Sequence, residues 1–144
     1  PLTLTQGRML LVHASADLPV QWRYVQDTVS AGASLDAATP MRHVFGGHVH
    51  FQTLYGRTNQ AQPSRYGFTA GVPVPVPDSQ QWLATLGSVG QPRDGNACAM
   101  YAVFDNDQLT LTFERVDYDH AAAAASVRRA GLPDFFADRL QQGR

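Results

Sequence analysis

Two apolar runs that each end in small residues and histidine constrain the fold of this chain more than any other feature. Met9-Leu10-Leu11-Val12 precedes His13-Ala14-Ser15, and Val44-Phe45 precedes Gly46-Gly47-His48-Val49-His50. Alternation along an extended segment sends His48 and His50 to the same side, where glycine lets a ligand approach the backbone. Open α/β sheets bind ligands outside the carboxyl ends of their strands, so the two strand ends can meet at one edge.

Histidines at this edge predict a metal site. Neutral imidazole is the commonest protein ligand for a metal ion, and a His-x-His pair behind two glycines offers the close access that an ion needs. We therefore expect His13, His48 and His50 to converge as metal ligands. His43 lies between Arg42 and Val44 at the start of a strand, and His120 opens an alanine-rich helix. Both are expected to be solvated.

Composition narrows the class of protein. The 144 residues are 44% hydrophobic and 16% charged, which predicts one globular domain over residues 1–144 without a second domain. The net charge of −1 offers no basic surface for nucleic acid or membrane, so small molecules are the expected partners. The single cysteine, Cys98, is typical of a reducing compartment. With no apolar run of roughly 18 to 20 residues and no signal-peptide pattern at Pro1-Leu2-Thr3, a cytoplasmic location is expected.

Hydrophobic periodicity predicts an α/β order of elements. The helix over Val20–Ala31 rests on Trp22, Val25 and Val29, with Gly32 as its stop. Asp119 is expected to cap a helix through Ala130, and Pro133 to begin a last helix with Phe136 and Leu140 on its core face. The expected strands are Arg8–His13, Arg42–Phe45, Phe51–Tyr55, Trp82–Leu86, and a hairpin of Ala99–Phe104 with Leu109–Arg115.

Two further segments are irregular. Val72–Pro77 alternates valine with proline, so it lacks half of its backbone donors and is expected to be an extended connector or an edge strand. A proline-rich ligand for another domain is the alternative for this segment. Gly87–Gly95 is a glycine-rich loop that can present backbone N–H groups to an anion. It matches neither a P-loop nor a dinucleotide fingerprint.

Three motifs in this order resemble the C-terminal half of the calcineurin-like metallophosphoesterases, in their compact bacterial branch. They are Leu11-Val12-His13-Ala14-Ser15, Gly47-His48-Val49-His50, and Gly87-Ser88-Val89-Gly90-Gln91-Pro92-Arg93-Asp94-Gly95. The tail Arg128-Arg129-Ala130-Gly131-Leu132-Pro133 is also similar. The resemblance implies a sandwich of two sheets flanked by helices, to which this chain supplies mainly one mixed or antiparallel sheet and three helices. It further implies that His13 and His48 bind the second metal of a two-metal site and that His50 binds the first.

The departures from that family pattern are equally specific. Family members carry Asp-x-His, Gly-Asp and Gly-Asn-His upstream of the first motif, and residues 1–12 contain none of them. Ala14, Val49 and Thr85-Leu86 replace residues that are usual in the family. Without the bridging carboxylate, which screens the repulsion between two divalent ions, this chain should hold at most one metal weakly. Asp17, Asp36 and Asp94 are the nearby carboxylates, although Asp17 and Asp94 are better explained as turn residues.

The implied function is metal-dependent hydrolysis of a phosphate monoester or diester, with Mn, Fe or Zn as the ion and only part of the site on this chain. The sequence identifies no residue in a catalytic role. The alternative is a non-catalytic remnant or subunit that packs against a partner half, with structural metal binding or none. The apolar runs at Leu10–Val12 and Val44–Phe45 also predict an interface on the sheet, filled by the missing half, by a second copy or by a retained segment.

Overall fold

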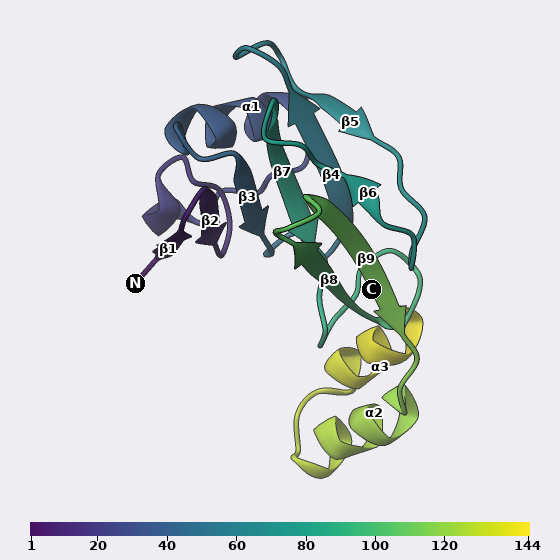
Figure 1. Ribbon diagram of the computed structural model, residues 1–144. Helices are drawn as coiled ribbons and strands as arrows, with labels where there is room; N and C mark the ends of the chain where they lie inside the picture. Colours follow the sequence, from purple (N-terminus) through teal and green to yellow (C-terminus); the bar gives the residue numbers. More distant parts are fainter.

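The computed structural model describes residues 1–144, and these form two β-sheets with helices at one face and at one end (Figure 1). The strands are β1 (Thr3–Gln6), β2 (Met9–Val12), β3 (His43–Gly46), β4 (Gln52–Arg57), β5 (Ser64–Tyr66), β6 (Val74–Pro75), β7 (Gln81–Leu86), β8 (Ala99–Asp105) and β9 (Thr110–Val116). The helices are α1 (Thr28–Ala37), α2 (His120–Arg129) and α3 (Asp134–Gln142), and Pro19–Gln21 form a short 3-10 turn, η1. The mixed α/β class expected from the sequence is confirmed.

The larger sheet has six strands in the order β1-β2-β3-β7-β4-β5. Its centre is parallel, because β2 pairs with β3 and β3 with β7 in the same direction, whereas β1, β4 and β5 run antiparallel to their neighbours. All the strands expected over residues 8–13, 42–45, 51–55 and 82–86 are confirmed to within two residues. The parallel centre carries the carboxyl ends of β2, β3 and β7 to one edge of the sheet.

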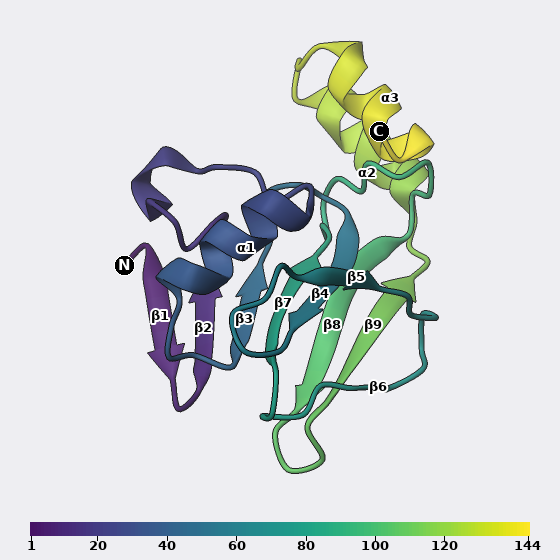
Figure 2. The ribbon, with the colours of Figure 1, turned by 90° about the horizontal axis from the view of Figure 1, so that it is seen from above.

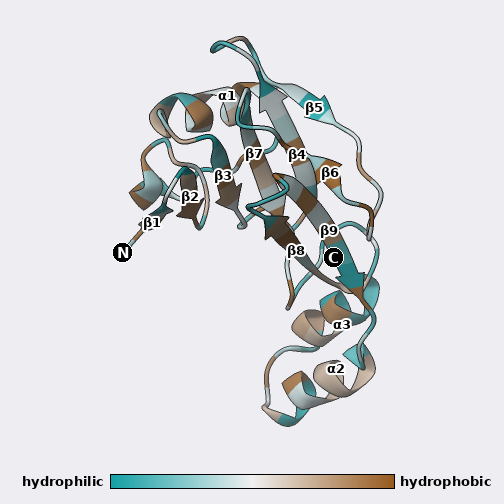
Figure 3. Ribbon diagram, in the orientation of Figure 1, coloured by the Kyte–Doolittle hydropathy of each residue, from teal (hydrophilic) through white to brown (hydrophobic).

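A second sheet packs on one face of the first. The chain itself forms this smaller sheet, with the order β6-β9-β8, so it supplies mainly one mixed sheet and three helices, as the resemblance implied. The two sheets share a core of Phe45, Leu54, Trp82 and Ala84 from the first with Leu111 and Phe113 from β9. Apolar colouring covers most of β8 in Figure 3. The Val72–Pro77 segment supplies β6, an edge strand of two residues, as its prolines required.

The other face of the large sheet is covered by α1 (Figure 2). This helix does not lie at Val20–Ala31, so the sequence-based placement was wrong. Asp27 caps the helix, because its carboxylate accepts a 2.8 Å hydrogen bond from the backbone N–H of Ser30, and the Ser30 hydroxyl completes a capping box. Gly32 does not end the helix but is buried within it, and Leu35 is 0% exposed in the core beneath.

The last two helices form a hairpin that projects from one end of the sheets (Figures 1 and 2). Asp119 caps α2 as expected, by accepting a 2.8 Å hydrogen bond from the N–H of Ala122. The expected core face of α3 was wrong, because Phe136 is 46% exposed. The buried residues are instead Ala124 of α2 and Ala137 of α3, which are both 0% exposed. Small side chains let these two short helices approach closely, so the larger ones remain outside.

Two histidines expected to be solvated are not. His43 is 2% exposed and donates a 2.7 Å hydrogen bond from Nε2 to the carbonyl of Val76. His120 is half-buried, and its Nδ1 is enclosed without a hydrogen-bond partner. Burial of an imidazole requires a specific partner, and for His43 that partner lies 33 residues later in the chain, directly after β6, which a local pattern does not reveal. None of the helices is both long and apolar enough to cross a membrane.

Candidate metal centre

The candidate site lies where three parallel strands end. His13 directly follows β2, residues Gly47 to His50 follow β3, and the Gly87–Gly95 loop follows β7. The first two segments are tied together, because the N–H of Gly47 donates a 2.9 Å hydrogen bond to the carbonyl of His13. A side chain on Gly46 would be tight, since a Cβ there would lie 3.0 Å from the Ala14 carbonyl oxygen. Glycine at this position lets the two strand ends approach.

His13 and His48 are in direct contact. Nε2 of His13 lies 3.1 Å from Nδ1 of His48, and their ring centroids are 4.9 Å apart. Two imidazole nitrogens that bind one ion at about 2.1 Å are separated by about 3.0 to 3.4 Å in tetrahedral or octahedral geometry. The observed separation therefore suits a pair of ligands to the same ion.

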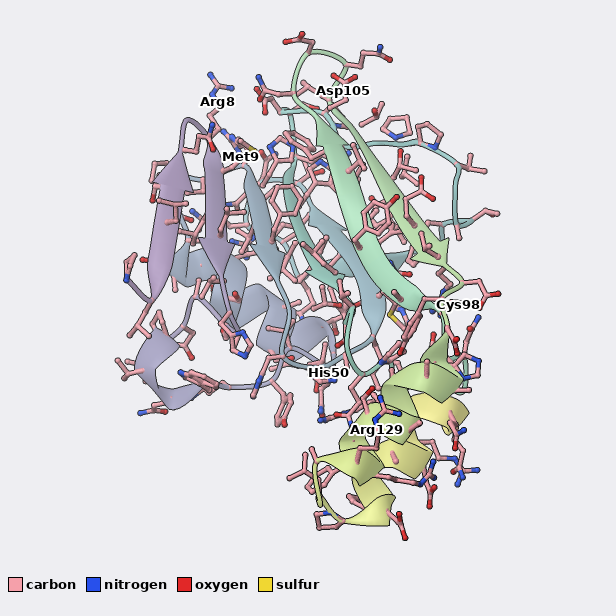
Figure 4. The ribbon with its side chains drawn as sticks, turned by 90° about the horizontal axis from the view of Figure 1, so that it is seen from below. Arg8, Met9, His50, Cys98, Asp105 and Arg129 are labelled. Atoms are coloured by element: carbon pink, nitrogen blue, oxygen red, sulfur yellow. The ribbon has the colours of Figure 1, made fainter.

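His50 lies on the same loop and has a different partner. Its Nδ1 donates a 2.6 Å hydrogen bond to the carbonyl of Gln91, in the glycine-rich loop, which leaves Nε2 as the free nitrogen. Metal-binding histidines commonly donate their second ring nitrogen to a carbonyl in this way, which fixes the tautomer. Figure 4 shows His50 at the end of the sheets near α2 and α3, far from Arg8 and Asp105.

The surroundings of two of these imidazoles lower their pKa values and so favour the neutral form. Partial burial, followed by the nearby His13, His50 and Arg93, lowers the pKa of His48. Burial is also the main cause that lowers the pKa of His50, and the charge of Arg93 adds to it, against the opposing effect of the Gln91 carbonyl. A neutral imidazole is the form that binds a metal ion, so both shifts favour ligation.

Two aromatic side chains that the sequence did not assign to the site stand beside the histidines. The Trp22 ring lies 4.5 Å from that of His13, and Tyr24 stacks on His48 at 4.3 Å between centroids. Trp22, His48 and His50 all have left-handed backbone conformations, with φ of 50°, 65° and 61°. Such strain in non-glycine residues concentrates at functional sites. The sequence analysis placed Trp22 in a helix over Val20–Ala31, which also contains Tyr24, and therefore did not assign these two aromatic residues to the site.

Arg93 is the second unassigned feature. Its backbone N–H donates to the carbonyl of His50 at 3.3 Å, and its side-chain Nε is buried without a partner. A guanidinium with an unsatisfied donor beside neutral histidines is suited to an anionic oxygen. The position was visible in the Gly-Gln-Pro-Arg motif, but nothing in the sequence placed that motif against His50.

Carboxylates do not complete the site on this chain. Asp17 pairs with Arg23 at 2.7 Å, Asp36 pairs with Arg57 at 2.7 Å, and Asp94 pairs with Arg115. No three histidine, cysteine, aspartate or glutamate side chains come together in an arrangement that could hold an ion. The geometry therefore offers a two-histidine pair with His50 beside it, and the three-ligand assignment stays a prediction.

Comparison with known proteins bears on this geometry. No protein-family model matches the chain. Over 67 residues it is 37% identical to the uncharacterized protein MJ0912 of Methanocaldococcus jannaschii, a match that covers 46% of this chain and 28% of that protein. All of this chain superposes on the crystal structure of a metallophosphoesterase from Sphaerobacter thermophilus, with a TM-score of 0.86 and 31% identity, and covers 58% of that chain.

A second solved structure, hypothetical protein PH1004 from Pyrococcus horikoshii OT3, matches the whole chain with a TM-score of 0.70. Its identity is 16%, so this likeness concerns the fold alone, and the chain covers 51% of that protein. The chain thus spans about half the length of the solved structures that it matches and a smaller share of the curated relative. Its fold is that of the calcineurin-like metallophosphoesterases.

Proposed function

We propose that this chain forms part of a metal-dependent phosphoesterase, in which His13, His48 and His50 are ligands to divalent metal ions. The observation that carries the proposal is the approach of His13 Nε2 to His48 Nδ1, at 3.1 Å, at the carboxyl ends of parallel strands. The superposition of the whole chain on a metallophosphoesterase supports it. Mn, Fe and Zn suit imidazole combined with carboxylate, and the carboxylates would come from outside this chain.

The bound ions would supply charge stabilisation and activate water toward a phosphate ester. The residues of this chain have supporting tasks. The lowered pKa values of His48 and His50 favour the neutral form that can offer a nitrogen to an ion, and the Gln91 carbonyl orients His50. The guanidinium of Arg93, whose backbone lies against His50, would pair with a phosphate oxygen. Trp22 and Tyr24 exclude water from one side of the histidine pair.

A second candidate function rests on the missing carboxylates. The nearest aspartates are engaged in ion pairs and no three-ligand group is present, which favours a non-catalytic subunit that packs on a partner, with structural metal binding or none. An open apolar hollow of about 440 Å³ lies over strands β1, β2, β3 and β7 of the large sheet, lined by Leu2, Leu4, Leu11, Phe45 and Leu86 among others. We propose that this hollow receives the complementary part of the domain, in either case. Cys98 is a free thiol, consistent with the cytoplasmic location that we propose.

Metal binding by the 144-residue chain tests the ligand assignment. We expect Mn²⁺ or Zn²⁺ to bind weakly in calorimetry, and His48→Ala to abolish the binding. The control is His120→Ala, which removes an imidazole at the start of α2 and should leave the binding unchanged. Equal binding by both variants would contradict the assignment.

Activity is a separate question, because the chain lacks the bridging carboxylate. We expect the chain alone to hydrolyse bis(4-nitrophenyl) phosphate negligibly in the presence of Mn²⁺. Reading the coding sequence that precedes Pro1 for Asp-x-His, Gly-Asp and Gly-Asn-His tests whether a complementary half exists. A chain fused to that half should gain chelator-sensitive activity, and an upstream sequence without these motifs would favour the non-catalytic subunit.

A further inference from the structure

A second cavity adjoins the candidate metal centre. Its volume is about 310 Å³, which is within the range of small-molecule sites. Two of the segments that line this cavity also contribute residues to the metal centre. Residues 22–26 place Trp22 and Tyr24 against the histidines, and Val25 and Gln26 in the cavity. The loop after β3 likewise contributes His48 and His50 to the centre, and Val49 and Phe51 to the cavity. The two sites therefore share their walls.

The floor of this cavity is apolar and includes aromatic rings. Val25 is 4% exposed, Val49 is 6% exposed and Tyr55 is 2% exposed, so these side chains are fixed in the core. Phe51 is 44% exposed and presents an accessible ring at the same cavity. A floor of this kind is suited to a flat apolar group and unsuited to a strongly hydrated ion.

Unpartnered polar groups complete the lining. Tyr55 is almost fully buried, yet its hydroxyl makes none of the hydrogen bonds in the structure. Arg65 lies directly opposite Tyr55 in the β4–β5 pair and forms no ion pair, and β5 is an edge strand of the large sheet (Figure 1). The side-chain amide of Gln26 is also without a protein partner. Gln26 and Arg65 are exposed residues that line the cavity, so their unpartnered donors are available to a ligand that carries hydrogen-bond acceptors.

We propose that this cavity binds a flat heteroaromatic group that carries hydrogen-bond acceptors, as a nucleobase does. The ring would pack on Phe51 and the valines, and Arg65, Gln26 and Tyr55 would donate to its acceptor atoms. A phosphate attached to such a group would extend over the shared walls toward His48 and Arg93. That the ligand is a nucleotide-like phosphoester rests on the proposed function. Binding of a heteroaromatic base in this cavity is independent of that function.

Metal-free binding tests the proposal directly. Adenosine 5′-monophosphate and ribose 5-phosphate carry the same phosphate and differ in the base, so we compare them by calorimetry and by amide chemical shifts. Stacking of a base on an aromatic side chain strengthens binding by roughly 5-fold or more. We expect adenosine 5′-monophosphate to bind at least about 5-fold more tightly and to shift the amides of Val49, Phe51 and Arg65.

Variants locate the binding. Arg65→Ala and Phe51→Ala remove exposed side chains, so the fold should persist, and each should weaken adenosine 5′-monophosphate binding about 3- to 10-fold. Arg42→Ala is the matched control, since Arg42 is another exposed arginine without an ion pair, at the opposite end of β3, and should have no effect. Equal affinity for the two phosphates, or no loss in either cavity variant, would overturn the proposal.

The outcome also separates this proposal from the proposed function. If the chain binds the nucleotide in the cavity but never acquires phosphoesterase activity when completed, only the proposed function fails. If the completed enzyme hydrolyses simple diesters but shows no preference for a base, only the cavity proposal fails.

Discussion

The packing of Gly56 against Trp82 gives a quantitative test of the structure. A Cβ added at Gly56 in β4 would lie 2.5 Å from Cζ3 and 2.7 Å from Cε3 of Trp82, and 2.9 Å from Cε2 of Tyr66. Carbon atoms are at their optimal separation at about 3.5 to 4.0 Å, so the indole must move by about 1 Å. Trp82 is 4% exposed, and its Nε1 donates a 3.0 Å hydrogen bond to the carbonyl of Pro77. The ring has little freedom to move.

These contacts set the size of the effect of Gly56→Ala. Overpacking a core costs about 1 to 3 kcal/mol, and a weakened Trp82 hydrogen bond adds about 0.5 to 1.5 kcal/mol. Replacing glycine in a strand offsets about 0.5 to 1 kcal/mol through the entropy of the unfolded chain. The free energy of unfolding should therefore fall by roughly 0.5 to 4 kcal/mol, which lowers Tm by about 2 to 13 °C in a chain of this size.

Urea denaturation followed by circular dichroism measures this loss. Gly67→Ala is the control, because a Cβ there meets nothing within 4 Å, and its stability should change by less than about 0.5 kcal/mol. Trp82→Phe removes the crowded part of the indole, so the double variant with Gly56→Ala should lose less stability than the sum of the single variants. If Gly56→Ala is no less stable than Gly67→Ala, the close approach of β4 to Trp82 is refuted.

Three further predictions concern α1 and the metal centre. Leu35→Ala should cost about 2 to 5 kcal/mol because Leu35 is 0% exposed, whereas Val29→Ala, 71% exposed on the same helix, should cost under about 0.5 kcal/mol in the same urea assay. Hydrogen bonds from Ser30 lower the pKa of Asp27 in the folded chain. The Asp27 carboxylate therefore stabilises the fold at pH values above the usual aspartate pKa, and this stabilisation is lost as the pH falls through the lowered pKa of the folded state. The difference in stability between the wild-type chain and Asp27→Asn should vanish in acid. His13→Ala should weaken Zn²⁺ binding in calorimetry as much as His48→Ala does, and unequal losses would argue against a shared ion.

Local signals predicted the strands well and the helix before β3 poorly. The runs at Met9–Val12 and Val44–Phe45 become strands because each is apolar and ends at small residues. For α1, the spacing of Trp22, Val25 and Val29 competes with the capping box of Asp27 and Ser30, and the capping box decides where the helix begins. The apolar spacing was accidental, since Trp22 and Val29 are exposed.

The candidate site was predictable to the extent that it depends on strand ends. Contact between His13 and His48 follows from two parallel neighbours that end at the same edge. The aromatic walls and the position of Arg93 depend on how loops fold back over that edge, and loop conformation has no hydrophobic period to read. The burial of His43 has the same cause, because its partner Val76 comes from a distant connection.

The attachment of the α2–α3 hairpin has a consequence for motion. The two helices pack mainly on each other, and the C-cap residue of α3, Gly143, seats against Asn96 while its carbonyl accepts a 2.9 Å hydrogen bond from Gly95. Such a small contact area between the hairpin and the sheets allows the hairpin to open as one cooperative unit, well before the sheets unfold. Gly95 ends the same loop that carries Gln91 and Arg93, so each opening would loosen the carbonyl that orients His50. Amide exchange in α3 and broadening of the His50 resonance should then share one timescale.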